Sequence, residues 1–254
     1  MASRSTGSNA CVTRSTQSWS FLHFFETKDS NARLNRVIEL VMATVTQNTT
    51  RTRLLEAAMA LFAEGGFEQT TVASISTQAE ANVAAVNYHF GDKQSLYREA
   101  LRAAYDQANQ TYPVALRADA NITPEQRLRH HIYAMIAQIF CPTQAGYLCR
   151  MVAKEFAEPT FAVDMIFSEL IRQNRAHMWI AISGILGANV SEQRIHLAMM
   201  SVVAQFQFYN FSRLIREIGR TAIVSLPESD AIAEHIYQFS LAGLRGMLEC
   251  PTEV

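Results

Sequence analysis

Residues 83–90 (VAAVNYHF) carry side chains whose types and spacing suit recognition of DNA bases. Val86 and Phe90 are four residues apart, so in a helix they share one face. The opposite face then presents Val83, Ala84, Asn87 and Tyr88. The small residues Ala84 and Ala85 let the backbone approach base edges, their methyl groups suit contact with thymine, and Asn87 can hydrogen-bond a base. This pattern predicts base reading rather than catalysis.

Side chains next to this face can contact the phosphate backbone. Tyr88 and His89 have polar tips that can reach phosphate, and Lys93 places a positive charge at the start of the next helix. Two alternatives stay open at this stage. His89 can instead cap or pack, and Tyr88 can be a surface aromatic residue.

Three short helices must position these side chains. A first apolar stripe consists of Leu54, Leu55, Ala58, Leu61 and Phe62. Gly65-Gly66 ends that helix. Thr71 and Asn82 are suitable N-caps for two short helices separated by a turn at Glu80-Ala81, and Asp92 can cap a longer helix. Short helices around a tight turn are the plan of a helix-turn-helix domain.

The rest of the chain also predicts helices. Thr123 followed by Pro124 is an N-cap with proline at the first helical position. The expected helices run from 124 to about 140 and roughly over 144–157, 160–186, 191–219 and 228–249. No segment shows sustained strand alternation. We therefore expect an all-α protein, with an N-terminal three-helix helix-turn-helix domain at 49–104 and a larger helical ligand-binding and dimerisation domain at 105–254.

The run from Thr50 to about Leu101 resembles the DNA-binding domain of the tetracycline-repressor (TetR) family. Its "LF…GF…TT" and "Y-H-F-x-x-K-x-x-L" elements are in register with that family. The resemblance implies base-reading positions at Val83, Ala84, Ala85 and Asn87. It implies backbone-contacting positions at Thr71, Tyr88, His89 and Lys93. Arg51 and Arg53 lie where an N-terminal arm can touch phosphate, although they can equally be solvated arm residues.

Two residues depart from the family pattern, and the local charge is weak. Glu80 stands where the family usually has a turn glycine, so a positive φ there would cost on the order of 1 kcal/mol. Asn87 replaces the usual tyrosine, and the aromatic ring follows at Tyr88. Residues 51–105 hold five basic and six acidic side chains. This balance predicts modest non-specific DNA binding with a shallow salt dependence.

The C-terminal part resembles, more loosely, the sensor domain of the CerR/CecR-type branch of the family, through Arg150–Thr160 (RMVAKEFAEPT). Ligand sites in helical sensors are apolar with a few convergent polar groups. Candidate ligand-binding residues of suitable type are Arg150, Glu155, His177, Trp179, Phe206 and Tyr209. Each can alternatively belong to the core or the surface.

The last two long helices are candidates for a homodimer interface. The helix at about 191–219 is apolar on nearly every side, so one face can serve its own core while the other needs a partner. With the helix at 228–249 it could form a four-helix bundle across a two-fold axis. The resemblance points to the same helices. A symmetric dimer predicts a palindromic double-stranded DNA operator.

Together these features predict a repressor released from its operator by a small hydrophobic effector of unknown identity. The alternative is a DNA-binding regulator controlled by a protein partner, or an activator, without a small-molecule inducer. An enzyme is not expected, because no nucleophile elbow, P-loop, zinc-protease or dinucleotide-binding motif occurs. No catalytic residues, metal ligands or cofactors are expected.

Four scattered cysteines, Cys11, Cys141, Cys149 and Cys250, form no CxxC pair and favour a reducing cytoplasm. Cys141 and Cys149 are interpreted as small apolar helix residues, or alternatively as a redox pair. The uncharged run 195–212 is nearly long enough to cross a membrane. Its His, Gln and Asn residues favour a buried helix instead, so no membrane partner is expected.

Residues 1–48 differ in composition from the rest. The first twenty are rich in Ser, Thr and Asn and contain no acidic residue. We expect a flexible tail with one possible short helix from Ser30 to Val45. Its composition faintly resembles an organellar presequence. The more economical hypothesis is that Met42 is the natural start, which N-terminal sequencing of the native protein would test.

Overall fold

A computed structural model describes residues 28–116, 121–211 and 227–249. The regular elements in these ranges are all helical, with no β-strand, which confirms the all-α prediction. The chain divides into two compact units, Met1–Asn48 and Thr49–Val254. The second unit carries the candidate site and the helices that position it.

Helix α1 is Lys28–Gln69. Residues 28–48 are therefore helical, where the sequence predicted a tail with a shorter helix at Ser30–Val45. The helix end predicted at Gly65-Gly66 corresponds to a break at Gly66, whose φ is 73°, after which α1 continues to Gln69. Only glycine adopts this region without steric cost.

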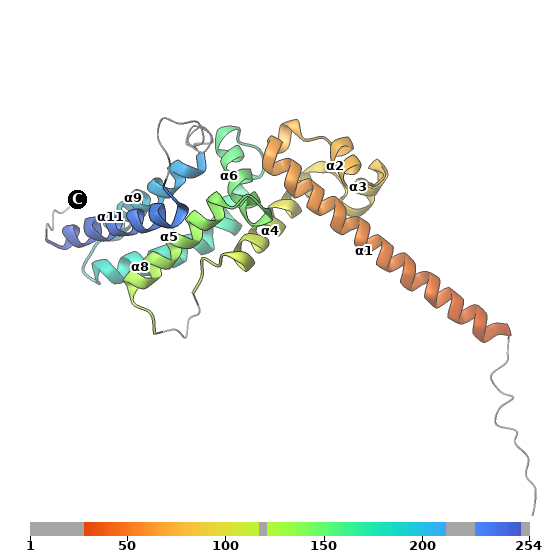
Figure 1. The fold of residues 1–254 in the computed structure, drawn as a ribbon, viewed down its shortest axis with the longest axis horizontal. Coiled ribbons are helices and arrows are strands. Elements are labelled where there is room, and N and C mark those ends of the chain that lie inside the picture. The colour runs from red at the N-terminus through yellow and green to blue at the C-terminus, as the bar shows by residue number, and fades with distance from the viewer. Residues whose placement is uncertain (1–27, 117–120, 212–226, 250–254) are drawn as a thin grey trace, which may run out of the picture. The chain divides into compact units, whose positions relative to one another are not determined.

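Three further helices complete the N-terminal part (Figure 1). They are α2 Val72–Gln78, α3 Val83–Phe90 and α4 Lys93–Thr111. The N-caps predicted for these three helices are confirmed. The side chain of Thr71 accepts from the backbone N–H of Ser74, that of Asn82 from Ala84, and that of Asp92 from Ser95. Each bond satisfies a donor that would otherwise lack a partner at a helix start.

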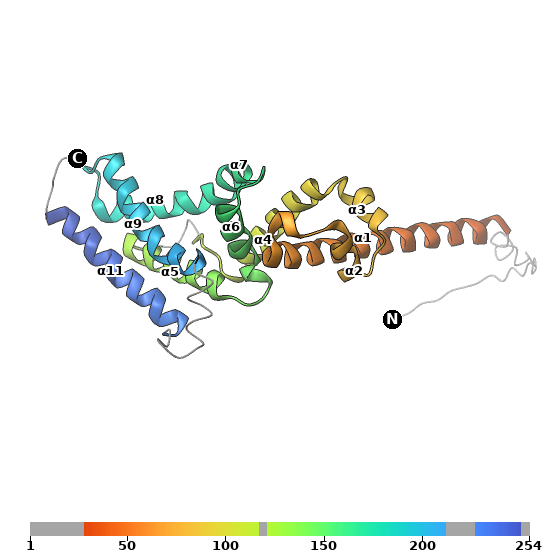
Figure 2. The same ribbon diagram turned by 90° about the horizontal axis from the view of Figure 1, so that it is seen from above.

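The C-terminal helices follow the predicted order. They are α5 Pro124–Phe140, η1 Gln144–Gly146, α6 Tyr147–Ala157, α7 Val163–Met165, the π-helical turn η2 Ile166–Ile171, α8 Arg172–Leu186, α9 Glu192–Phe211 and α11 Ser229–Glu249. The predicted extension of α9 through residues 212–219 lies outside the described residues. Figure 2 shows α5, α8, α9 and α11 lying together, with α6 next to α4.

Two apolar clusters hold these helices together. One joins α5, α8, α9 and α11, with Ile132, Ile182 and Phe206 among its members. The other contains the helix-turn-helix core, but it also takes in Met151 of α6 and Ile166 of η2. The hydrophobic core therefore does not divide at the expected domain boundary between residues 104 and 105. Met151 and Ile166 pack in the same cluster as the buried side of α4, so α6 and η2 contact the N-terminal helices through α4.

Candidate nucleic-acid interface

The two faces of α3 divide as the sequence predicts. Val86 and Phe90 are buried, with 0% and 6% of their surfaces exposed. Val83 and Tyr88 are 48% and 68% exposed. Ala84 and Asn87 are also exposed, whereas Ala85 is partly buried and packs against the core. Of the four base-reading positions that the family resemblance implies, Val83, Ala84 and Asn87 are therefore fully available to a base edge. The methyl group of Ala85 is partly covered by packing.

Glu80 occupies the turn before α3 in a strained conformation. Its φ is 50°, and it is the one non-glycine residue with a positive φ among the described residues. Two backbone hydrogen bonds stabilise the turn. The N–H of Glu80 donates to the carbonyl of Thr77, and the N–H of Ala81 donates to the carbonyl of Ser76. The exposed carboxylate of Glu80 lies 3.9 Å from the guanidinium of Arg53. The negative charge of Glu80 therefore partly neutralises the positive charge of Arg53, a candidate phosphate-contacting residue.

The other candidate cations contact aromatic rings. The guanidinium of Arg51 pairs with the carboxylate of Glu99 and lies 4.9 Å from the ring centre of Phe90. The ammonium of Lys93 lies 4.1 Å from the ring centre of Phe67. Both cations therefore help to join α1, α3 and α4. Their contact with phosphate stays a prediction.

Thr71 and His89 both have structural roles, and only that of Thr71 leaves its predicted phosphate contact unaffected. Thr71 is exposed and forms a reciprocal capping box with Ser74. His89 is partly buried, and the centre of its ring lies 4.9 Å from the ring centre of Tyr88 and 6.3 Å from that of Phe90. Packing, one of the two alternatives for His89, thus occurs in this structure.

A buried hydrogen-bond network joins the helix-turn-helix to the C-terminal helices. The hydroxyl of Tyr97 on α4 donates to Oε1 of Glu155 on α6, 2.7 Å away. The backbone N–H and the hydroxyl of Thr160 donate to the same carboxylate at 2.9–3.0 Å. Tyr97 and Glu155 are 0% and 3% exposed. Burial and the neighbouring Glu155 raise the pKa of Tyr97, so its hydroxyl keeps its proton.

Two surface contacts continue this connection along α4. Arg102 donates two hydrogen bonds to the carboxylate of Glu169, at 3.0 and 3.2 Å. The hydroxyl of Tyr105 donates to Gln173 at 3.1 Å. These residues tie α4 to η2 and α8. Sequence reasoning missed them because partners more than sixty residues apart leave no local pattern.

The six candidate ligand residues do not converge on one site. Arg150 donates to the backbone carbonyls of Cys141 and Thr143 and lies over the ring of Tyr147. Glu155 belongs to the network just described. His177 and Trp179 are partly buried on α8, and the Trp179 ring lies 4.8 Å from His196.

Phe206 and Tyr209 lie on the side of α9 that faces α5, where Phe206 is buried and Tyr209 is partly buried. The ring centre of Phe206 lies 6.3 Å from that of His131, and the ring centre of Tyr209 lies 5.9 Å from that of Phe140. His131 was missed as a ligand candidate. Its position three residues after the buried Leu128 places it on an inward face, which the sequence could have indicated.

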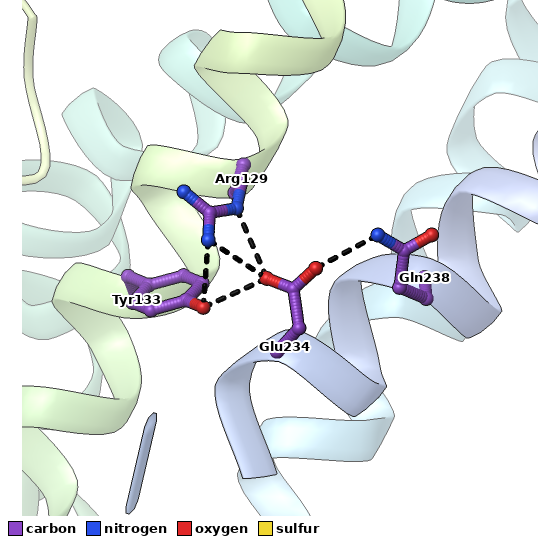
Figure 3. Close-up of polar contacts among 4 residues, drawn as sticks. All are labelled: Arg129, Tyr133, Glu234 and Gln238. Carbon is purple, nitrogen blue, oxygen red and sulfur yellow. Dashed lines mark hydrogen bonds and ion pairs between the residues drawn. The ribbon is translucent and has the colours of Figure 1, made fainter. Parts of the chain in front are cut away.

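A polar network holds α11 against α5 (Figure 3). The carboxylate of Glu234 accepts hydrogen bonds from Arg129 at 3.0 Å, Tyr133 at 2.7 Å and Gln238 at 2.7 Å. Hydrogen bonds from Gln238 and Tyr133 lower the pKa of Glu234 to about 2, and Arg129 adds to this effect. Glu234 therefore stays ionised and keeps α11 in register with α5.

The outer faces of α9 and α11 lack charge over much of their length. After the exposed first turn of α9, which holds Glu192 and Gln193, the exposed side chains are all uncharged: Leu197, Met200, Ser201, Ala204, Phe208 and Phe211. On α11, Phe239 is 66% exposed and is followed by the exposed small residues Ala242, Gly243 and Gly246. The helices are adjacent, and Gln205 donates to Ser240 at 3.0 Å. We call the exposed residues of these two rows the α9 and α11 stripes.

In the described part of the chain, no helix is long and apolar enough to cross a membrane. Within the same ranges, no group of three or more His, Cys, Asp or Glu side chains is arranged to hold a metal ion.

Comparison with known proteins matches both halves of the chain. Residues 54–100 match the model for bacterial regulatory proteins of the tetR family. Residues 124–244 match the model for the C-terminal domain of the HTH-type transcriptional dual regulator CecR.

Individual relatives agree with these matches. The dual regulator CecR of Shigella flexneri is 23% identical over 189 residues, covering 70% of this chain and 84% of that protein. The repressor NicS of Pseudomonas putida is 38% identical over 80 residues, covering 32% and 37%. A regulator structure from Pseudomonas aeruginosa PAO1, with 17% identity and a TM-score of 0.58, covers 78% of this chain and 92% of its own and shares the fold.

The exposed face of α3, the capped helices that present it and the two successive family matches lead to one conclusion. The chain belongs to the TetR family of DNA-binding transcriptional regulators.

Proposed function

We propose that the protein is a homodimeric repressor, working in the cytoplasm where its DNA lies, that a small, largely apolar effector releases from a palindromic operator. The observation that carries the proposal is the exposed face of α3, with Val83, Ala84, Asn87 and Tyr88 presented by a buried Val86–Phe90 anchor. Small side chains at the start of α3 permit close approach to a major groove, and Asn87 supplies hydrogen bonds to adenine. Base reading by these residues is part of the proposal.

The α9 and α11 stripes support the homodimer. Exposed phenylalanines, together with small residues that allow helices to approach closely, suit helix packing between copies. A Cβ added at Gly243 or Gly246 would meet no atom within 4 Å in this chain, so both positions are open to a partner. Two-fold pairing would present two α3 helices to successive half-sites.

The connections along α4 support release by an effector. Glu155 and Glu169 join α4 to the sensor helices at two points. An effector that favours a different arrangement of those helices would shift α4 and change the spacing of the recognition helices. This is a population shift between two states, with the effector binding one state better.

The test is selection of bound duplexes from a random DNA library, followed by binding measurements on the enriched sequence. We expect enrichment of a palindrome and one dimer per duplex. Absence of any enriched sequence at low salt would contradict the proposal. Asn87→Ala should lose discrimination at one base pair in each half-site, whereas Asp164→Asn, an exposed change on α7 away from the proposed interface, should keep it.

A second candidate, activation, has one specific observation in its favour, since the CecR relative is named a dual regulator. A reporter gene carrying the selected sequence distinguishes the two. Deletion of the regulator should raise expression if it represses and lower expression if it activates.

A further inference from the structure

The α5–α9 contact contains a buried imidazole with an unsatisfied nitrogen. His131 is 4% exposed, and its Nδ1 has no hydrogen-bond partner. Leaving such an atom unpaired in an apolar interior is costly, so native proteins rarely keep one without a reason. Burial also lowers the pKa of His131 to about 3, so the ring is neutral and Nδ1 can exchange a hydrogen bond with an uncharged group.

One aromatic ring packs against this imidazole, and further aromatic and polar side chains lie along the same two helices. Phe206 faces His131, and Phe140 faces Tyr209, across the same pair of helices. Gln138, seven residues after His131 on α5, is 1% exposed and donates to the carbonyl of Tyr112. A largely apolar wall with a few polar groups is the usual lining of a small-molecule site.

Charge excludes several ligand classes. Among the described residues, the one buried Asp, Glu, Lys or Arg is Glu155, which belongs to the other apolar cluster. No buried cation is therefore available beside His131 to compensate an anionic ligand, and no buried carboxylate to compensate a cationic one. Burying an uncompensated charge is far more costly than burying a hydroxyl.

We infer that His131 is the hydrogen-bonding anchor of an effector site between α5 and α9. The ligand class is an uncharged, largely apolar molecule of aromatic-ring size with one hydroxyl or carbonyl group. This inference rests on the proposed effector response and assigns a residue and a chemistry to it. The ligand's polar group would satisfy Nδ1 while its ring packs against Phe206 and Tyr209.

The test uses two pairs of compounds that differ by a hydroxyl and a methyl group: phenol with toluene, and 1-naphthol with 1-methylnaphthalene. The full chain is labelled with ¹⁵N-histidine, and the ring nitrogens of His131 are assigned by their loss in His131→Phe. We expect each hydroxyl compound to shift the Nδ1 resonance and to bind about 10-fold more tightly than its methyl partner. His131→Phe should bind both members of a pair equally.

His130→Gln is the matched control, since His130 neighbours His131 in sequence but bonds the carbonyl of Pro113 outside the core. It should keep the preference for the hydroxyl. His131→Phe should also unfold at a temperature no lower than the parent chain, because it removes an unpaired polar group. A clearly lower unfolding temperature would reveal a partner in the core and overturn the inference.

Three further outcomes would overturn the assignment. The parent chain could bind the hydroxyl and methyl compounds of a pair equally, it could bind them without a shift of the His131 Nδ1 resonance, or it could bind none of the compounds. Operator affinity is measured in the same samples. If 1-naphthol binds at His131 but leaves operator affinity unchanged, the site stands and the proposed effector response fails. If 1-naphthol releases the parent chain and His130→Gln from the operator but does not release His131→Phe, both the His131 site and the proposed effector response are supported.

Discussion

Glu80 is the residue at which local strain and charge coincide. A side chain at positive φ costs about 1–2 kcal/mol relative to glycine, and the Glu80 φ of 50° lies in that region. Glu80→Gly should therefore stabilise the fold by about 1 kcal/mol, a rise of about 2–4 °C in unfolding temperature. Glu80→Gln retains the strain and should leave the temperature unchanged. Calorimetry of the three chains checks this, and an equal rise in both variants would contradict it.

The charge of Glu80 should also weaken operator binding. Its carboxylate lies 3.9 Å from Arg53 and next to the start of α3. Both Glu80→Gln and Glu80→Gly should tighten DNA binding several-fold at low salt, and less at high salt. Fluorescence anisotropy over a salt series measures this effect. Glu192→Gln removes an exposed charge at the start of α9 and should change nothing.

Tyr97 shows how a single bond connects two elements. Tyr97→Phe keeps the ring but leaves the buried carboxylate of Glu155 with one donor fewer. An unsatisfied buried group costs about 1–3 kcal/mol, and we expect a loss of that size by denaturant unfolding. Because α4 is joined to α6 by this bond, operator affinity should change as well.

Glu155→Gln provides the control for that coupling. The double variant should lose less stability than the two single variants together, with an interaction energy of at least about 0.5 kcal/mol. Strict additivity would show that Tyr97 and Glu155 act independently and would remove the basis for transmission through α4.

The α9 and α11 stripes make a prediction at the same scale. Phe208 is 55% exposed in one chain, so Phe208→Glu should leave the fold intact but place a charge in the proposed interface. Sedimentation should then show a monomer with much weaker operator binding. Ile180→Glu alters an equally exposed apolar residue on α8 and should remain dimeric. A dimeric Phe208→Glu would place the interface elsewhere.

Stability of the whole molecule should depend on pH through His131. Its folded pKa is about 3, below the ordinary 6.5, because of burial and, to a smaller extent, His177 and His130. As pH falls from 6.5 toward 3, the unfolded chain takes up a proton that the folded chain does not, so stability falls. The slope contributed is at most about 1.4 kcal/mol per pH unit.

His131→Phe should remove that part of the slope, which calorimetry between pH 6.5 and 4.5 can measure. The carboxyl groups of Asp92, Glu169 and Glu234 have lowered pKa values. The stability that they contribute is therefore present above about pH 4 and is lost only at lower pH, as these groups become protonated. His130→Gln should keep the parent slope. An unchanged slope in His131→Phe would show that the folded chain protonates His131.

The approximate helix ranges, the N-caps Thr71, Asn82, Asp92 and Thr123 and the division of α3 into two faces follow from sequence alone. All depend on neighbours within four residues, where helical period, capping and turn geometry act. The Tyr97–Glu155 bond, the stacking of Arg51 and Lys93 on aromatic rings, and the unpaired Nδ1 of His131 depend on tertiary structure. Their partners are distant in sequence, and burial and hydrogen-bond satisfaction are properties of the packed interior.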